Sequence, residues 1–396
     1  MKNIIITRRK VLTSTAAAAV TLGMPSIVRA AESVKLGFVT ALTGLEAVLG
    51  VPQLNMMTMA TDEINEQGGI GGRKLEYVVE DTQTSTQAVV DRSRKVIFQD
   101  NVDALFGLIA TTELAAALTV TVPAKKLQFF PIYYPGGECH KYAVFTGQVA
   151  EQQILPMMPW LVESVGKRHY VMGSDFSWGR RSSQIIEASL KELGGEYLGA
   201  EFFPFGVQDL GQPFQKIHSL KPDVVWFFFA GSDAITAVKQ YHDFGLEKVA
   251  RVVSDAWDEV FLGSMPAEPQ TGIITNQAYF DILDNPVNKA FVERYRKRYG
   301  EDKRINATME SAYIAIWLYA KAVEKAGSTN TEAVLKALPE VDFEAPQGGR
   351  VSISALNNHM RANSIAAQVT SEGAFEIIKQ YGQIDPIVPG CDLQKA

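Results

Sequence analysis

From residue 34 onward, short apolar runs alternate with longer segments whose apolar residues recur at every third or fourth position. The short runs predict buried strands, at 34–39, 75–80, 104–107 and 128–131. The longer segments predict helices that end near residues 65, 98 and 122, the first of them at a Gly-Gly pair. Strands separated by helices of this length form right-handed βαβ units in a parallel sheet that is covered on both faces.

The same rhythm restarts after about residue 151. It predicts helices at 151–165, 179–193 and 233–244, and strands at 169–173, 197–203, 223–229 and 251–254. The predicted fold is therefore α/β, with two doubly wound parallel-sheet lobes joined by a hinge. Ligands of such sheets bind outside the carboxyl ends of the strands, so the two lobes are expected to face each other across a binding cleft.

The remaining segments are expected to complete the two lobes. Residues 281–342 are mostly helical in pattern, and the last fifty residues are strand-like. We therefore assign 32–150 plus 280–343 to lobe 1 and 151–279 plus 344–396 to lobe 2. The chain is expected to cross between them near 148–152, 275–279 and 343–347.

Residues 1–31 differ from the rest of the chain. A basic stretch with the pair Arg8-Arg9 precedes a mildly apolar run at 11–28, and small residues follow at Ala30 and Ala31. This order is typical of an export signal that is cleaved near Ala30/Ala31, and the paired arginines resemble the twin-arginine signal of bacteria. The sequence therefore predicts a periplasmic protein. General secretion is the alternative to the twin-arginine route, and a basic N-terminal helix of a cytosolic protein is the alternative to an export signal.

Charge and cysteine content narrow the function. Loss of the five positive charges within residues 1–31 takes the formal net charge from −6 to −11, which does not suit nucleic acids or an anionic bilayer. No later run is long and apolar enough to span a membrane. Two cysteines cannot build a zinc ribbon or a disulfide scaffold. In an oxidising compartment Cys139 and Cys391 could pair, but the sequence gives no geometry for it.

Motifs of enzymes are missing from the sequence. The five histidines show no H-x-x-x-H spacing, and the chain has no G-x-S-x-G, P-loop or G-x-G-x-x-G motif. We therefore expect neither an enzyme nor a bound metal or cofactor.

Polar and aromatic side chains gather where predicted strands end in the first half. Thr111 and Thr112 open a helix after the third strand, where they could cap it or receive a ligand carbonyl or carboxylate. Tyr133 and Tyr134 follow the fourth strand in a loop rich in Pro and Gly. Tyrosine suits a small polar ligand that must lose its water, although one of the two could equally pack in the core.

The second half repeats the pattern. Asp175 and Phe176 follow the strand at 169–173, and Asp255 follows the strand at 251–254. Asp255 could accept a hydrogen bond from an ammonium or amide group, or simply be solvated. Asp233 follows the strand at 223–229, where it could contact a ligand or instead cap the N-terminus of the next helix.

Several motifs give the chain a family resemblance. They are GFVTALTG at 37–44, DEIN at 62–65 with GGIGG at 68–72, FPIYYPGGEC at 130–139, FTG at 145–147 with QQ at 152–153, GSDF at 173–176, LKPDVV at 220–225 and MESAY at 309–313. With these motifs the chain resembles the type I periplasmic substrate-binding proteins of the leucine/isoleucine/valine-binding family. It looks most like the branch of that family that binds urea and short-chain amides.

The resemblance implies two lobes joined by three crossover strands, closing on a small molecule that is delivered to an ABC permease and ATPase pair in the inner membrane. By position it places ligand contacts on the 42–46 loop and on residues already singled out above. The implied ligand-binding set is Thr43, Glu46, Thr111, Thr112, Tyr133, Tyr134, Asp175, Phe176 and Asp255.

The chain also departs from the urea-binding pattern. Pro135 stands where that branch tends to carry Glu, and Phe176 where it tends to carry Tyr, whereas Asp233 and Asp255 favour a ligand with an amino or amidine group. The expected ligand is a small polar solute: urea, a short-chain amide or a related amino compound. The alternatives are a branched-chain amino-acid binding protein, a ligand sensor on the same fold, and an exported hydrolase.

Overall fold

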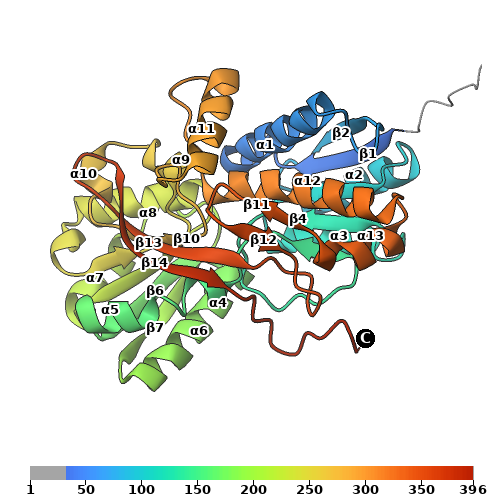
Figure 1. Cartoon of the computed structure of the whole chain (residues 1–396). Coiled ribbons are helices and arrows are strands. Elements are labelled where there is room, and N and C mark those ends of the chain that lie inside the picture. Colours follow the sequence, from blue (N-terminus) through green and yellow to red (C-terminus); the bar gives the residue numbers. More distant parts are fainter. Residues whose placement is uncertain (1–32, 396) are drawn as a thin grey trace, which may run out of the picture. The chain divides into compact units, whose positions relative to one another are not determined.

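The computed structural model describes residues 33–395 and contains two separate main β-sheets (Figure 1). The export segment predicted at residues 1–31 lies outside the described residues. We call the sheet formed by residues 34–145, with its helices, lobe 1. The sheet formed mainly by residues 168–277, with its helices, is called lobe 2.

The sheet of lobe 1 has five parallel strands in the order β2-β1-β3-β4-β5. The strands are β1 (Val34–Thr40), β2 (Leu75–Asp81), β3 (Ala104–Gly107), β4 (Leu127–Phe130) and β5 (Ala143–Phe145). The helices contacting this sheet form two layers, in which α1 packs against α12 and α2 against α3. Their bounds are α1 (Ala47–Glu66), α2 (Thr86–Phe98), α3 (Thr111–Thr121), α12 (Ala307–Ala326) and α13 (Thr331–Ala337).

The sheet of lobe 2 has seven strands in the order β14-β13-β10-β9-β8-β6-β7. The strands are β6 (Arg168–Ser174), β7 (Glu196–Phe203), β8 (Val224–Phe228), β9 (Arg251–Val253), β10 (Ile274–Gln277), β13 (Ala362–Val369) and β14 (Phe375–Ile384). The first five are parallel, whereas β13 and β14 run antiparallel to their neighbours. Its helices are α4 (Ala150–Gln153), α5 (Met158–Ser164), α6 (Ser177–Leu193), α7 (Gly211–Leu220), α8 (Ser232–Asp243), α9 (Glu259–Leu262) and α10 (Ala267–Gln270).

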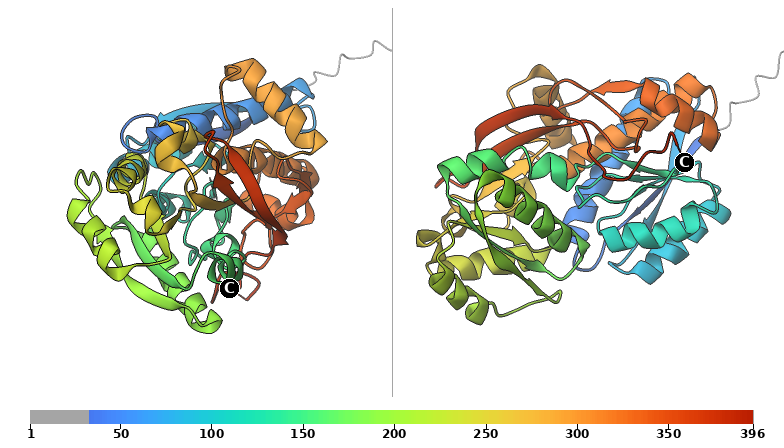
Figure 2. Two further views of the ribbon diagram at one scale, coloured as in Figure 1. Left: turned by 90° about the vertical axis from the view of Figure 1, so that its left-hand side faces the viewer. Right: turned by 90° about the horizontal axis from the view of Figure 1, so that it is seen from below.

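The two lobes are connected where the chain leaves one sheet for the other, as the side views show (Figure 2). After β10 the chain forms α11 (Pro286–Tyr299), then α12 and α13 on lobe 1, then the hairpin β11 (Asp342–Glu344) and β12 (Arg350–Ser352), before it returns to lobe 2 as β13 and β14. Buried amide groups tie these passages together. Gln347 donates its backbone N–H to Glu310 over 3.0 Å, and Gln148 donates to the Asn363 carbonyl over 2.8 Å. The predicted residue limits of the lobes stay a prediction.

A disulfide joins Cys139 to Cys391 across 252 residues. Cys139 lies in the loop between β4 and β5, and Cys391 lies in the C-terminal segment that follows β14. The pairing that the sequence left open is therefore present. It connects the segment leaving the lobe 2 sheet to a loop of lobe 1.

The parallel α/β arrangement predicted from the sequence is confirmed, and one predicted helix is wrong. The helix predicted at 151–165 is two helices, because Pro156 between them cannot donate a backbone hydrogen bond and disfavours helical geometry at the preceding residue. Strand β10 lies in a stretch where no strand was predicted, at the start of the crossing expected near 275–279, and it pairs with both β9 and β13. Helix α7 lies in a stretch where no helix was predicted.

Candidate ligand-binding site

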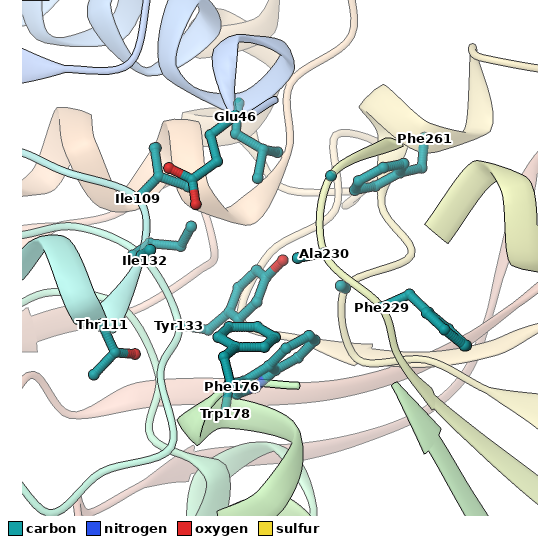
Figure 3. A pocket seen from close by; sticks show the side chains of 14 residues that line it. Glu46, Ile109, Thr111, Ile132, Tyr133, Phe176, Trp178, Phe229, Ala230 and Phe261 are labelled. Carbon is teal, nitrogen blue, oxygen red and sulfur yellow. The ribbon is translucent and has the colours of Figure 1, made fainter. Parts of the chain in front are cut away.

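A pocket lies between the two lobes, at the carboxyl ends of the parallel strands (Figure 3). The space between its walls amounts to about 490 Å³, part of it open to solvent. Lobe 1 contributes Glu46, Leu49, Ile109, Ala110, Thr111, Ile132 and Tyr133. Lobe 2 contributes Phe176, Trp178, Phe229, Ala230, Gly231, Ala256 and Phe261.

Glu46 is placed by the close approach of α1 to the end of β1. Gly50 makes this approach possible, since a Cβ atom built there would lie 1.9 Å from the Ala41 carbonyl oxygen. Glu46 is the N-cap residue of α1, but its side chain does not cap the helix. The carboxyl group points into the pocket instead (Figure 3), and its Oε2 atom is buried without a hydrogen-bond partner among the described residues.

The environment of Glu46 disfavours its charge. Burial, reinforced by the nearby Glu113 carboxylate, raises the pKa of Glu46 to about 8. Glu113 sits in the first turn of α3, where its Oε2 atom accepts from the backbone N–H groups of Ile109 (2.9 Å) and Ala110 (3.4 Å). Its Oε1 atom is buried and lacks a partner within residues 33–395. An unliganded pocket therefore holds Glu46 mainly as the neutral acid at pH 7.

The two neighbouring tyrosines face in different directions. Tyr133 lines the pocket, its ring 5.4 Å from that of Trp178, and its hydroxyl points toward Ala230 (Figure 3). Tyr134 is 1% exposed, and its ring stacks on Phe145 at 4.8 Å. The Tyr134 hydroxyl is hydrogen-bonded to Nε2 of His359, whose pKa burial lowers to about 4. Tyr133 is thus presented to a ligand, whereas Tyr134 is part of the core.

The wall contributed by lobe 2 consists of aromatic rings and small residues. Phe176 and Trp178 stand at the beginning of α6, and Phe261 comes from α9. Gly231 has a φ of +51°, which L side chains rarely adopt, and a Cβ atom there would lie 3.0 Å from the Leu45 carbonyl oxygen of lobe 1. The absence of a side chain at Gly231 thus permits the close approach of the two lobes.

Five of the expected ligand-binding residues do not line this pocket. Thr43 donates its hydroxyl to Asp81 over 2.7 Å, and Thr112 lies one residue beyond the lining on α3. Asp175 is exposed and forms an ion pair with Arg180 at 2.6 Å. Tyr134 is in the core, as described above. The structure brings Glu46, Thr111, Tyr133 and Phe176 together, and a role of any of the nine in binding a ligand stays a prediction.

Asp255 is the fifth of these residues and has an unusual environment. It is fully buried next to Ala256, and neither carboxyl oxygen has a partner of good hydrogen-bond geometry among the described residues. Burial raises the pKa of Asp255 to about 8, although the Asn276 backbone amide acts in the opposite direction. Solvation, one of the two roles that the sequence left open for Asp255, is therefore wrong.

Sequence reasoning missed most of the apolar lining. Trp178, Phe229, Ala230 and Phe261 were not among the expected contacts, although each follows the carboxyl end of a strand. Their position after strands β6, β8 and β9 was the one available signal.

No group of three or more His, Cys, Asp or Glu side chains within 33–395 is arranged to hold a metal ion. No helix in that range combines the length and hydropathy needed to cross a bilayer.

Comparison with known proteins decides the family. A model of the family described as "Periplasmic binding protein domain" matches residues 34–389, which is most of the chain. The chain belongs to the periplasmic binding protein family. Membership of this family implies a periplasmic protein that binds a small molecule. Its members are binding proteins of transport systems and are not enzymes.

Two curated relatives of this binding protein carry related names. It is 24% identical over 365 residues to "Leu/Ile/Val-binding protein homolog 7" of Brucella suis, an alignment that covers 86% of this chain and 90% of the relative. It is 21% identical to "Leu/Ile/Val-binding protein homolog 4" of Brucella abortus, with 92% and 94% covered.

Solved structures with similarly low sequence identity to this protein share its fold. A solute-binding protein of an ABC transporter from R. palustris, in complex with benzoate, matches this binding protein with a TM-score of 0.82 at 19% identity, covering 91% of this chain and all of that one. A leucine-binding protein from Thermotoga maritima matches with a TM-score of 0.78 at 20% identity, covering 88% and 98%. These likenesses confirm the type I periplasmic binding protein fold, and they do not support assignment of this chain to the urea and amide branch.

Proposed function

We propose that this protein is the periplasmic solute-binding component of an ABC importer, which closes on a small amide or amino compound and delivers it to the membrane permease. The observation that carries the proposal is the pocket between the carboxyl ends of two sheets, lined from both lobes. A solute held there contacts both walls at once. Such a ligand favours the closed form because it has differential affinity for the two states.

The lining suggests which solute fits. Glu46 offers acceptor oxygens, and the N-terminus of α3 at Thr111 offers donors, so one polar end of the solute has partners on lobe 1. The rings of Tyr133, Phe176 and Trp178 offer apolar surface to the rest of the molecule. Urea has no apolar part to place there. Within the expected ligand class, an amide or amino compound with an alkyl or aryl body therefore fits best.

A branched-chain amino acid is the second candidate. Its ammonium group would face Glu46, and its carboxylate would face the N-terminus of α3. The names of the Brucella relatives favour this reading. Ligand screening decides between the two candidates.

The test is a thermal-shift screen of the mature chain against amides, ureas, amidines, amines and amino acids. A ligand at about a hundred times its dissociation constant should stabilise the protein by about 2.7 kcal/mol. Mass spectrometry of compounds that co-purify provides an independent identification. If no compound of these classes stabilises the protein and none co-purifies, the proposal is wrong.

The route to the periplasm is part of the proposal. We expect residues 1–31 to direct export, with cleavage near Ala30/Ala31. Replacing Arg8 and Arg9 by lysine should retain the precursor in the cytoplasm if the twin-arginine route is used, whereas general secretion should tolerate the change. Western blotting of periplasmic and cytoplasmic fractions separates the two outcomes.

A further inference from the structure

Buried acidic side chains surround the pocket. Six carboxyl groups, none more than 7% exposed, belong to a lining residue or to a residue within three positions of one. They are Glu46, Glu113, Asp233, Asp255, Asp258 and Glu259. An uncompensated buried carboxylate is costly, so such a cluster favours a partner that supplies positive charge or hydrogen-bond donors.

The helix N-termini at the pocket already have acidic partners. Glu113 occupies the first turn of α3 and accepts from the backbone N–H groups of Ile109 and Ala110, the two residues that precede this helix. Asp233 occupies the first turn of α8 and accepts from the Gly206 backbone N–H over 3.0 Å. Asp258 caps α9 by accepting from Val260 over 2.9 Å. The positive ends of these helix dipoles are therefore partly neutralised before any ligand arrives.

Basic groups near the pocket are engaged elsewhere. None of the fourteen lining residues is Lys, Arg or His. The nearest basic residues in sequence are on α6: Arg180 pairs with Asp175, and Arg181 donates to the Pro135 carbonyl over 2.6 Å. A free carboxylate on the solute would therefore lack a charged partner in the lining.

Two acceptor atoms on the lobe 1 side have no donor. Oε2 of Glu46 and Oε1 of Glu113 are both buried and unpartnered within the described residues. Leaving a buried acceptor unsatisfied costs free energy, and a donor supplied by the solute would recover it. The rings of Tyr133 and Trp178 line the same pocket, and the face of an aromatic ring attracts a cation.

We propose that the pocket selects solutes that carry a protonated nitrogen, as an amine or amidine, on an apolar body, with that nitrogen bound to the Glu46 carboxylate. This inference rests on the proposed function and narrows its substrate class. A planar amidinium matches a carboxylate with two parallel hydrogen bonds, and an ammonium matches it with one.

Binding is accompanied by loss of a proton from Glu46. The titratable groups around it are Glu113 on α3 and Tyr133 after β4, with Asp255 and Asp258 across the gap acting on Tyr133. Because the unliganded pocket holds Glu46 as the neutral acid, a cationic solute must displace that proton. Affinity for a permanently charged amidinium should therefore rise with pH, by up to about tenfold per unit, and level off above about pH 8.

The experiment compares probes of equal shape and different charge. Benzamidine, benzamide and benzoate form one set, and acetamidine, acetamide and acetate form a smaller set. Affinities are measured by isothermal titration calorimetry on the mature chain, in two buffers of different ionisation enthalpy, at pH 6, 7 and 8. In at least one set the amidine should bind best and the carboxylate worst, with close to one proton released at pH 7.

Two variants assign the effect to Glu46. Because Gln resembles the neutral acid in shape, Glu46→Gln should leave the melting temperature of the unliganded protein nearly unchanged. It should weaken amidine binding roughly ten- to hundredfold, change amide binding much less, and remove the pH dependence. Glu66→Gln is the control, because this exposed residue lies at the other end of the same helix.

The outcomes separate this inference from the proposed function. Tightest binding by a carboxylate or a neutral amide, or an unchanged amidine affinity in Glu46→Gln, overturns the inference and leaves a solute-binding protein. Failure of the amidines and of the amines to bind, when an amino acid or amide from the wider screen does bind, also overturns it. Only the failure of every class in that screen overturns the proposed function.

Discussion

The two walls of the pocket differ in chemistry. Lobe 1 presents a carboxyl group, a hydroxyl and the start of a helix through Glu46, Thr111 and α3, whereas lobe 2 presents aromatic rings and small residues with no charged side chain in the lining. In the function that we propose, the polar end of a solute therefore has its partners on lobe 1, whereas lobe 2 covers the apolar remainder and excludes water. Neither wall alone would then make a complete site.

The two walls belong to lobes that the disulfide between Cys139 and Cys391 connects. Its removal shows how much this connection stabilises the folded protein. Replacing Cys139 and Cys391 by serine should lower the free energy of unfolding by about 2–5 kcal/mol, because the crosslink closes a very long loop in the unfolded chain. Urea denaturation measures the change. Treating the wild-type protein with a reductant should reproduce it, and equal stability with and without the bond would contradict the expectation.

Closure itself depends on Gly231 of lobe 2. We expect Gly231→Val to weaken ligand binding by about a hundredfold or more, because the side chain would meet the Leu45 carbonyl of lobe 1 and keep the walls apart. Gly245→Val is the matched control, since Gly245 also has a positive φ (+66°) but open space where a Cβ would lie. Calorimetric titration of both variants decides. Equal losses of affinity would mean that backbone strain, not the gap between the lobes, is responsible.

The adjacent tyrosines provide a contrast within lobe 1. Tyr134→Phe should destabilise the protein by about 1–3 kcal/mol, because it leaves the buried His359 nitrogen without its partner, and should leave affinity nearly unchanged. Tyr133→Phe should do the reverse, with little effect on unfolding. Measuring unfolding and binding for both variants tests the assignment. A loss of affinity confined to Tyr134→Phe would reverse the roles given to the two residues.

The aromatic wall of lobe 2 should contribute less per residue. Phe176→Ala is expected to weaken binding about tenfold through lost apolar contact. Phe205→Ala is the control, because the Phe205 ring lies 5.4 Å from that of Phe176 but Phe205 is 48% exposed and does not line the pocket. If the two substitutions weaken binding equally, the pocket wall extends to Phe205.

The fold was largely predictable because its signals are local. Apolar runs such as 104–107 and 224–228 are buried on both faces, as parallel strands between helices must be. The exceptions needed information from distant residues. Strand β10 is only four residues long and is stabilised by β13, about ninety residues later, so its own sequence did not distinguish it from a connecting segment.

The site was predictable in place but only partly in its residues. Strand ends located the pocket, yet the orientation of a loop side chain depends on partners that are distant in sequence. Tyr134 faces the core because His359 and Phe145 lie there, and no local pattern distinguishes it from Tyr133. Asp175 is an exception, because its partner Arg180 is only five residues away, on α6. Trp178 and Phe261 line the pocket although their residue types suit a core position equally well.

A crystal structure of the mature protein with benzamidine tests most directly which wall of the pocket holds the polar end of a ligand and which contacts its ring. We expect the ring between Tyr133, Phe176 and Trp178, and an amidine nitrogen about 3 Å from a Glu46 carboxyl oxygen. Benzamidine bound outside the gap between the lobes, or bound inside it with its ring against Glu46 and its nitrogens toward lobe 2, would contradict the proposed binding mode.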